Sequence, residues 1–394
     1  MRNPGSALFP SPCKGEDEGE GPFTARIFRA RFKILPLLSI ALLALSSPAL
    51  AQPCLPAFPY RTGWVGGDGA SSIPLDPDRE LWLFGDSFVS RPGRRTRAGS
   101  TMVANTIAIS SCRSGKWSIE YHWRASAQGH KARRKRAFFD SGTHAFRYWP
   151  LDGFLYQKTL YVALLRVETT NPRKPFGFKL IGVDLAKVAN PDAPPDQWSI
   201  TYTSLSKSRA AFPGVSIVLL APYAYFFGVM ERDANKRQAV ILTRISLDHL
   251  ARPAESLEYL AAGGKWKPAP IQADADDLVA QGQADFSVRY HRKMAKWVML
   301  LQQPGFRSGQ VGVSTAANLD GPWSPFRSLM NEPEMHARRS HRKRIFCYAA
   351  KEHPSFESTP GTLLVTYTCN SLHFKTLVSD MSIYRPIVTQ LQMH

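Results

Sequence analysis

The sequence predicts an all-β fold, a single five-bladed β-propeller that follows an N-terminal signal segment. Five weakly similar units recur at spacings of roughly 60 to 85 residues, each a strand, a tight turn and a more apolar strand, as is typical of propeller blades. Thirty prolines and 27 glycines are spread along the 394 residues, which favours many short strands joined by turns. Helical periodicity is nearly absent, and Asp276 to Gln281 is at most a turn or two.

A two-sheet sandwich is the alternative all-β architecture. Its strands would follow one another with turn signals about every 8–12 residues. The repeating units of this chain are much longer, so the propeller is the favoured prediction.

The first unit carries the most informative residues. Trp64 to Ile73 is predicted as a strand of small residues that holds Asp68 between two glycines. After a turn at Pro74 to Arg79, Leu81 to Phe84 is predicted as a buried strand, and Asp86 follows it. Glycine beside a carboxylate allows close approach of backbone or ligand, and paired carboxylates are what glycosidic chemistry requires. The alternative is that both aspartates are turn residues that bond their own backbone.

The remaining strands follow in order along the chain. The second unit, Tyr148 to Val167, repeats the first, because Trp149-x-x-Asp152-Gly153 parallels Trp64-x-x-x-Asp68-Gly69. The other predicted strands are Thr101 to Ser111, Trp117 to Trp123, Phe178 to Val183, Trp198 to Thr203, Gly214 to Leu220, Tyr225 to Met230, Ala239 to Ile245, a strand pair from Ala284, Gln310 to Thr315, a strand pair from Cys347, and Ser382 to Val388.

Residues 1–51 are predicted to be a leader, and residues 52–394 the propeller. A positive segment at 26–33 precedes the apolar segment Ile34 to Leu45, and Ala49-Leu50-Ala51 is an A-x-A cleavage site. Residues 1–25 are an unusually long lead-in, consistent with a mis-assigned start codon. No later stretch is long and apolar enough to span a membrane. The leader therefore predicts a periplasmic or secreted bacterial protein.

Cysteine use agrees with export. After residue 51 four cysteines remain, an even number that suits an oxidising compartment. Three pairings are possible; Cys347–Cys369 is favoured because both lie on one hairpin-like unit, and Cys54–Cys112 follows by elimination. No C-x-x-C spacing indicates zinc. No metal site or cofactor is expected, with a structural calcium ion held by channel carboxylates as the alternative.

The chain is strongly basic. After residue 51 it holds 44 lysines and arginines against 27 acids, a net charge of +17. Three basic runs lie at 91–97, 130–136 and 336–344, and they predict affinity for an anionic glycan or lipopolysaccharide. The alternative is that each run is a solvated loop. No nucleic-acid-binding motif is present, so nucleic acid is not an expected partner, and a monomer is expected.

Several motifs together resemble a known family. They are GGDGA with LWLFGDS, YWPLDG, DFSVRY with KWVML, GPWS, and EHPSF with GTLLVTYTCNS. This combination resembles a five-bladed propeller family catalogued as a domain of unknown function, with members associated with endo-D-arabinanase activity and related in fold to propeller glycosidases. The resemblance covers nearly all of residues 52–394. It implies that the first strand of each blade lines a central channel, with the site at one mouth.

The resemblance implies a catalytic pair, Asp68 and Asp86, with Asp152 as a third acid that tunes a pKa or positions substrate. One protonated acid and one ionised carboxylate are what a glycosidase needs, and crowding raises one pKa. Asp285 is a weaker candidate, because its neighbours fit the start of a strand.

Five further residues are predicted to bind substrate. Trp64 and Trp149 could stack on sugar rings, His353 could face the channel, and Asn105 and Asn370 are polar channel groups. For the tryptophans and the histidine, burial in the core is the competing interpretation.

Two functions follow. The first is an exported glycoside hydrolase that cleaves a cell-envelope polysaccharide, arabinan-like or other, through Asp68 and Asp86. The alternative is a non-catalytic propeller that binds an anionic envelope glycan or a partner protein. No phosphate-binding glycine loop, G-x-S-x-G elbow or H-E-x-x-H motif points to another reaction class.

Overall fold

The computed structural model describes residues 54–61, 63–125, 134–172, 176–233, 237–304, 308–336, 344–356, 359 and 361–393. The predicted leader, residues 1–51, lies outside these ranges, as do parts of the basic runs at 130–136 and 336–344. In the described part no helix is long and apolar enough to cross a membrane.

The described residues form five main antiparallel sheets, in chain order. The first contains β2 (Ser71–Asp76), β3 (Arg79–Phe84), β6 (Thr106–Arg113) and β7 (Lys116–His122). The second contains β10 (Arg147–Tyr156), β11 (Thr159–Thr169), β12 (Phe178–Val188) and β13 (Ile200–Ser206). The third contains β14 (Ala211–Leu220), β15 (Tyr223–Glu231), β16 (Gln238–Ser246), β17 (Glu258–Ala261) and β18 (Lys265–Pro268).

The fourth sheet contains β19 (Phe286–His291), β20 (Lys296–Gln302), β21 (Gln310–Ala316) and β22 (Arg327–Asn331). The fifth contains β23 (Ile345–Glu352), β24 (Thr362–Ser371) and β25 (Pro386–Gln392). Two smaller sheets pair β1 (Trp64–Gly67), β4 (Ser87–Val89) and β5 (Thr101–Val103), and β8 (Arg124–Ala125) with β9 (Lys135–Arg136). The α-helices of the described residues are α1 (Pro333–His336) and α3 (Phe374–Ser379), and short 3₁₀ turns occur at Pro195–Gln197, Leu247–His249, Pro253–Glu255 and Pro354–Phe356.

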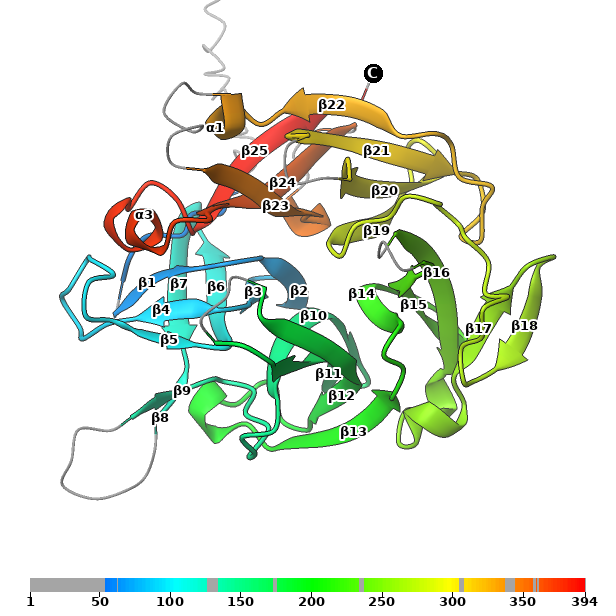
Figure 1. The fold of residues 1–394 in the computed structure, drawn as a ribbon, viewed down its shortest axis with the longest axis horizontal. Coiled ribbons are helices and arrows are strands. Elements are labelled where there is room, and N and C mark those ends of the chain that lie inside the picture. Colours follow the sequence, from blue (N-terminus) through cyan, green and yellow to red (C-terminus); the bar gives the residue numbers. More distant parts are fainter. Residues whose placement is uncertain are drawn as a thin grey trace, which may run out of the picture. The chain divides into compact units, whose positions relative to one another are not determined.

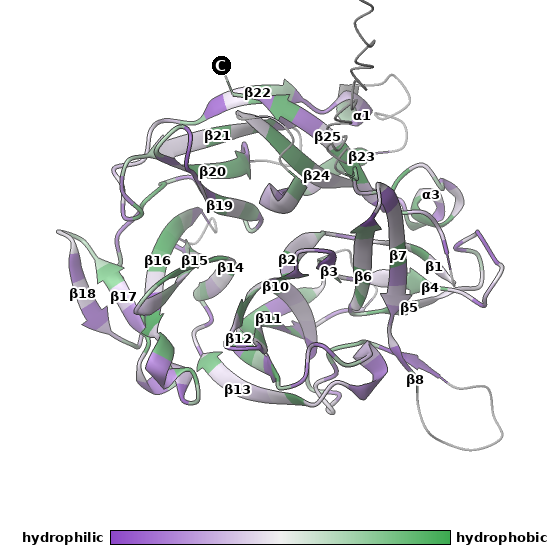
Figure 2. Ribbon diagram, turned by 180° about the vertical axis from the view of Figure 1, so that it is seen from behind, coloured by the Kyte–Doolittle hydropathy of each residue, from purple (hydrophilic) through white to green (hydrophobic). Residues whose placement is uncertain are grey.

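The five sheets lie around a common centre, and β2, β10, β14, β19 and β23 are the strands nearest to it (Figure 1). Outer strands are more polar than inner ones; β18 is coloured hydrophilic, whereas β16 is largely hydrophobic (Figure 2). This arrangement confirms the all-β prediction. The helix α3 was not predicted, and Asp276 to Gln281 forms no helix.

The apolar core lies between neighbouring sheets, including the first and the fifth. Ile73 and Leu83 of the first sheet pack with Leu160 of the second. Trp82 of the first sheet packs in one cluster with Leu364 of the fifth. Burial of apolar faces on both sides of a sheet explains why the central strands carry near-continuous apolar runs.

The turn of the first sheet is stabilised as its sequence predicts. Asp76 Oδ1 accepts hydrogen bonds from the backbone N–H groups of Asp78 and Arg79, at 2.9 and 2.8 Å. Its Oδ2 pairs with the Arg79 Nε at 2.6 Å. An aspartate that bonds the backbone two and three residues ahead closes a turn between paired strands, so β2 and β3 are held in register.

The predicted strand from Trp64 to Ile73 is divided in two, and this changes the position of Asp68. β1 pairs with β4, whereas β2 pairs with β3. Asp68 lies in the break, next to Gly69, whose φ is +66°. A left-handed glycine allows the chain to change direction there, so Asp68 leaves the sheet and projects from a bend.

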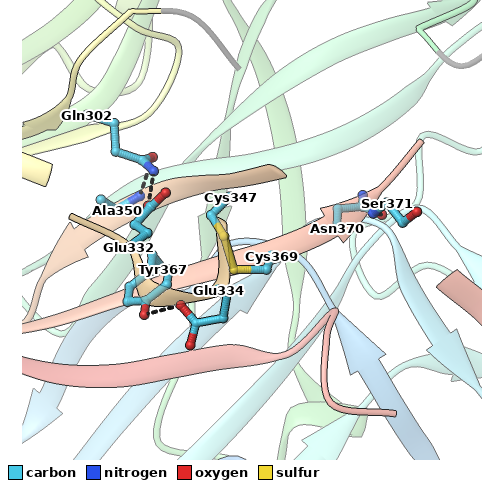
Figure 3. Close-up of a disulfide and its surroundings, with 9 residues drawn as sticks. All are labelled: Gln302, Glu332, Glu334, Cys347, Ala350, Tyr367, Cys369, Asn370 and Ser371. Carbon is cyan, nitrogen blue, oxygen red and sulfur yellow. Dashed lines mark hydrogen bonds between the residues drawn. A yellow bond between two sulfur atoms is a disulfide. The ribbon is translucent and has the colours of Figure 1, made fainter. Parts of the chain in front are cut away.

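Both predicted disulfides are confirmed, Cys54–Cys112 and Cys347–Cys369. Cys347 and Cys369 are direct register partners on β23 and β24, with their Cα atoms 4.0 Å apart. Figure 3 shows this bridge between the two strands, with Asn370 directly after Cys369. The bridge therefore fixes one point of the fifth sheet covalently.

Candidate active site

Asp68 and Asp86 are neighbours through their backbones. Asp68 follows β1, and Asp86 lies between β3 and β4. The N–H of Asp68 donates to the carbonyl of Asp86 at 3.2 Å, and the N–H of Gly85 donates to the carbonyl of Asp68 at 2.8 Å. A Cβ on Gly85 would lie 2.2 Å from Asp68 Oδ1, so the FGD sequence needs its glycine to admit the Asp68 carboxyl group.

The Asp68 carboxyl group is set between two tyrosines of the fifth-sheet region. The Tyr348 hydroxyl donates to Asp68 Oδ2 at 2.9 Å, and the Tyr384 hydroxyl lies 3.5 Å from the same oxygen. Burial raises the pKa of Asp68 well above its usual value, and the negative charges of Asp86 and Asp285 raise it further. Of Asp68 and Asp86, Asp68 is therefore the more readily protonated carboxyl group.

The Asp86 carboxylate has different neighbours, both from β10. The Trp149 Nε1–H donates to Asp86 Oδ1 at 3.0 Å, and Arg147 Nε lies 3.9 Å from the same oxygen. Burial raises the pKa of Asp86, while the Arg147 charge and the Trp149 hydrogen bond lower it. The side chain of Asp86 is 23% exposed, so it can be reached from solvent.

Asp285 is a third acid near this pair. It lies directly before β19, half-buried, and its charge acts on Asp68. Burial raises the pKa of Asp285, whereas the positive charge of Lys351 lowers it. The first, second, fourth and fifth sheets thus contribute acids or their partners to one group of interacting charges.

Asp152, in contrast, is buried in the interior of the protein. It is 2% exposed, and its Oδ2 accepts the Ile217 N–H at 2.8 Å and lies 3.3 Å from Arg289 Nη2. Its Oδ1 accepts the N–H of Gly153 at 2.9 Å. This carboxylate joins the second, third and fourth sheets, whereas Asp285 is the further acid whose charge acts on Asp68.

A buried lysine, Lys351, interacts with the charges of both Asp285 and Asp152. Lys351 is 5% exposed, and its Nζ donates to the carbonyls of Val215 and Phe286 at 2.8 and 2.7 Å. Burial lowers the pKa of Lys351, and the charges of Asp285 and Asp152 raise it. The lysine fixes the strands around it and supplies positive charge beside Asp285.

Two of the predicted substrate-binding residues lie in the packed interior. Trp64 is fully buried, donates to Thr106 Oγ1 at 3.2 Å and stacks on Tyr121 at 4.3 Å. Asn105 is also fully buried; its Nδ2 donates to the carbonyls of Phe139 and Tyr148, both at 2.9 Å. Their side chains are satisfied within the protein, so neither is placed to contact a sugar.

His353 also lies in the interior and contacts other side chains of the protein. It is fully buried, with Nδ1 2.8 Å from Ser72 Oγ and Nε2 2.7 Å from Thr366 Oγ1. Burial lowers the pKa of His353 to about 3, so the ring is neutral. The histidine connects the segment after β23 to β2, which joins the fifth sheet to the first.

Trp149 and Asn370 do lie at the acid pair. Trp149 contacts Asp86 as described, and its ring packs on Phe178 with centroids 4.8 Å apart. Asn370 Nδ2 donates to the Tyr348 hydroxyl at 3.2 Å. The sequence did not identify Arg147, Tyr348 or Tyr384; the only local signal was that Tyr348 and Asn370 each follow a bridged cysteine.

The basic run at 91–97 contains one residue that is not solvated. Arg91, Arg94 and Arg95 are exposed, as the loop interpretation predicts. Arg97 is 1% exposed and donates to the carbonyls of Val65 and Leu377, at 2.9 and 2.7 Å. Arg97 therefore holds together the backbone segments that lead to Asp68 and to Tyr384, and its guanidinium is occupied inside the protein.

Among the described residues, one group of three potential metal-ligand side chains lies close together, Glu334, Cys347 and Cys369. Both sulfurs belong to a disulfide, which removes the thiolates that a soft metal would need.

Comparison with known proteins gives the family and the fold. No curated protein is significantly similar to the chain. A "putative hydrolase" from Bacteroides ovatus has a TM-score of 0.66 and 17% identity, over 84% of this chain and 86% of that chain. An endo-arabinase from Bacteroides thetaiotaomicron has a TM-score of 0.43 and 14% identity, over 86% of this chain and 99% of that chain.

The family described as "Domain of unknown function (DUF5005)" matches residues 57–393. This range includes β1 to β25 and the three acids Asp68, Asp86 and Asp285, which together form the acid cluster. The resemblance drawn from the motifs is thereby confirmed, and the chain belongs to the DUF5005 family.

Proposed function

We propose that this protein is an exported, five-bladed propeller glycoside hydrolase that cleaves a cell-envelope polysaccharide through Asp68 and Asp86. The observation that carries the proposal is the unequal surroundings of two adjacent carboxyl groups. Asp68 faces negative charge, whereas Asp86 faces Arg147 and the Trp149 N–H. Environments that push two pKa values apart are the arrangement that assigns an acid and a base.

Each aspartate then has a role. Asp68, protonated, donates its proton to the glycosidic oxygen as the leaving group departs. Asp86, ionised, either activates a water molecule or attacks the anomeric carbon, in inverting or retaining hydrolysis respectively. Asp285 holds the pKa of Asp68 up, and Tyr348 orients its carboxyl group by donating to Oδ2.

The groups beside the acids suit a sugar. Trp149 is a half-buried aromatic ring next to Asp86, and Asn370 is a half-buried amide next to Tyr348. Aromatic faces pack on the apolar face of a pyranose or furanose ring, and amides bond its hydroxyls. An arabinan-like glycan is the first substrate to test.

Export and a monomeric state complete the proposal. Two disulfides suit an oxidising compartment, in agreement with the leader predicted over residues 1–51. The experiment is oligosaccharide release from a panel of neutral and acidic envelope polysaccharides, including arabinan, by the chain from residue 52 onward. Release from at least one glycan supports the hydrolase, and release from none contradicts it.

A non-catalytic module that binds an anionic glycan is the second candidate. The exposed arginines at positions 91, 94 and 95, together with the net charge of +17, favour it. Retention on an anionic polymer without product release, equal for the natural protein and Asp68→Asn, would support this candidate.

Removing one charge on either side of the acid pair should shift opposite limbs of the pH profile. Activity needs Asp68 protonated and Asp86 ionised, which gives a bell-shaped profile. Asp285→Asn removes a negative charge that raises the pKa of Asp68, so the alkaline limb should move to lower pH. Arg147→Gln removes a positive charge that lowers the pKa of Asp86, so the acid limb should move to higher pH. Initial rates from pH 4 to 10 measure both; movement of the same limb in both variants would contradict the assignment.

The Cys347–Cys369 disulfide lies next to the site and should influence activity as well as stability. Tyr348 and Asn370 each follow a bridged cysteine, and the N–H of Tyr384 donates to the Cys369 carbonyl at 2.7 Å. Cys347→Ala with Cys369→Ala should cost about 2–4 kcal/mol of stability and, by misplacing these groups, lower kcat by up to about 10²-fold.

The Cys54–Cys112 bridge provides the matched control. Cys112 lies next to Ser111, the partner of Arg79, at the opposite end of β3 from Asp86. Cys54→Ala with Cys112→Ala should lower the unfolding temperature but leave kcat unchanged where both variants are folded. Equal kcat losses in the two double variants would show that the Cys347–Cys369 bridge has no positioning role.

A further inference from the structure

We propose that a cavity outside the acid cluster binds an anionic sugar unit of a glycan. The cavity has a volume of about 380 Å³ and lies between the small sheet β8–β9 and the outer strand β13. Arg124, Arg136, Phe138, Trp198 and Tyr202 are among the residues that line it. A volume near the lower end of the range for small-molecule sites suits one or two sugar rings.

Two arginines and one acid, Asp140, line the cavity, and within the described ranges Arg124 is the arginine that has no carboxylate partner. Arg124 lies over the Phe138 ring, with its Cζ 4.7 Å from the centroid, and its Nη1 donates to the Asp196 carbonyl at 3.1 Å. Among the described residues no carboxylate forms an ion pair with Arg124. By contrast, Arg136 is paired with Asp140 at 2.6 Å. An anion entering the cavity would therefore find one guanidinium free to pair with it.

The aromatic residues form a fixed wall. Phe138 packs edge-on against Trp198 with centroids 5.5 Å apart, and the Trp198 Nε1–H donates to the Ala193 carbonyl at 2.8 Å. Tyr202 is 37% exposed and stacks on Tyr148 with centroids 5.3 Å apart. A rigid, partly exposed aromatic ring beside a guanidinium provides stacking for a sugar and an ion pair for its acidic group.

The chemistry defines the ligand class. A guanidinium fork binds a carboxylate or a phosphate in two parallel hydrogen bonds. Both groups occur on sugars, as uronic acids or as phosphate esters. The ligand is therefore an anionic sugar, and the two sources of charge are separated by experiment.

The cavity is separate from the acid cluster but shares a strand with it. Tyr148 supports Tyr202, and the next residue on β10, Trp149, donates to Asp86. Successive side chains of a strand point to opposite faces, so β10 contributes to both sites. The inference rests on the cavity's own residues and does not require hydrolysis at Asp68.

The test is calorimetric titration of the chain from residue 52 onward with trigalacturonate, galactotriose and glucose 6-phosphate. We expect trigalacturonate or the phosphate ester to bind and galactotriose to bind at least 10-fold more weakly. Arg124→Gln should weaken anionic-sugar binding at least 10-fold, because a charge-assisted hydrogen bond is lost. Tyr202→Ala should weaken it through loss of the stacking ring.

Two controls keep the result specific. Arg292→Gln and Arg327→Gln each remove an exposed arginine that does not line this cavity; both should leave the affinity unchanged. Unfolding temperatures verify that each variant is folded. The proposal is overturned by equal affinity in Arg124→Gln, by equal binding of galactotriose, or by no binding of any anionic probe. None of these outcomes depends on glycan cleavage, so failure of the cavity and failure of the hydrolase are distinguishable.

Discussion

Asp68→Asn and Asp86→Asn should each lower glycan cleavage by about 10²- to 10⁴-fold, the usual contribution of general acid–base catalysis. Asparagine keeps the shape of the side chain, and its carbonyl can still accept from Tyr348 or Trp149. The loss would therefore report the missing proton donor or the missing negative charge. Oligosaccharide release, measured by reducing ends, provides the rate.

The two variants should differ on activated substrates. An aryl glycoside with an acidic phenol departs without proton donation, so Asp68→Asn should regain much of its rate on such a substrate. Asp86→Asn should stay inactive, because its missing carboxylate is needed whatever the leaving group. Equal recovery of both variants would contradict the assignment of Asp68 as the acid.

Stability provides the control for these substitutions. The folded-state pKa of Asp68 is raised, so stability falls as the pH rises from the unfolded-state pKa towards the folded-state pKa, because the unfolded chain loses its proton first. Asparagine removes this cost, and Asp68→Asn should be at least as stable as the natural protein at neutral pH. Asp78→Asn, an exposed turn aspartate of the same sheet, should keep full activity; a loss there would point to a nonspecific effect.

Arg97→Ala should cost at least about 3 kcal/mol of unfolding free energy, because it leaves buried carbonyl groups without a donor. The Arg97 guanidinium donates to carbonyls from two distant segments, near residue 65 and around residues 377 to 384. It also lies 3.0 Å from the Tyr60 hydroxyl. Urea unfolding followed by tryptophan fluorescence measures the loss.

Two further variants, Arg97→Lys and Arg95→Ala, make this prediction specific. Arg97→Lys keeps the charge but lacks the planar fork, so it should recover only part of the stability. Arg95→Ala removes an exposed arginine of the same run and should change stability by less than about 0.5 kcal/mol. Full stability of Arg97→Lys would mean that charge alone, rather than the set of fixed hydrogen bonds, holds these segments together.

The sequence by itself determined the class of fold and several local features. Alternating apolar strands with frequent prolines and glycines required an all-β protein, because only local periodicity and turn chemistry are needed to recognise one. The four cysteines and the unit pattern led to both disulfides, and the motifs led to the family. The sequence also pointed to Asp68 and Asp86, since glycine beside a carboxylate is a local signal.

Only the tertiary structure decided what surrounds those aspartates. Tyr348 lies 280 positions from Asp68, and Arg147 lies 61 positions from Asp86. Contacts of this range depend on which sheets meet at the centre, which no local pattern encodes. The same reason explains why Asp152, Trp64, Asn105 and His353 proved to be buried. Burial and charge at a site are sums over neighbours from the whole chain, whereas a sequence motif records only the neighbours along it.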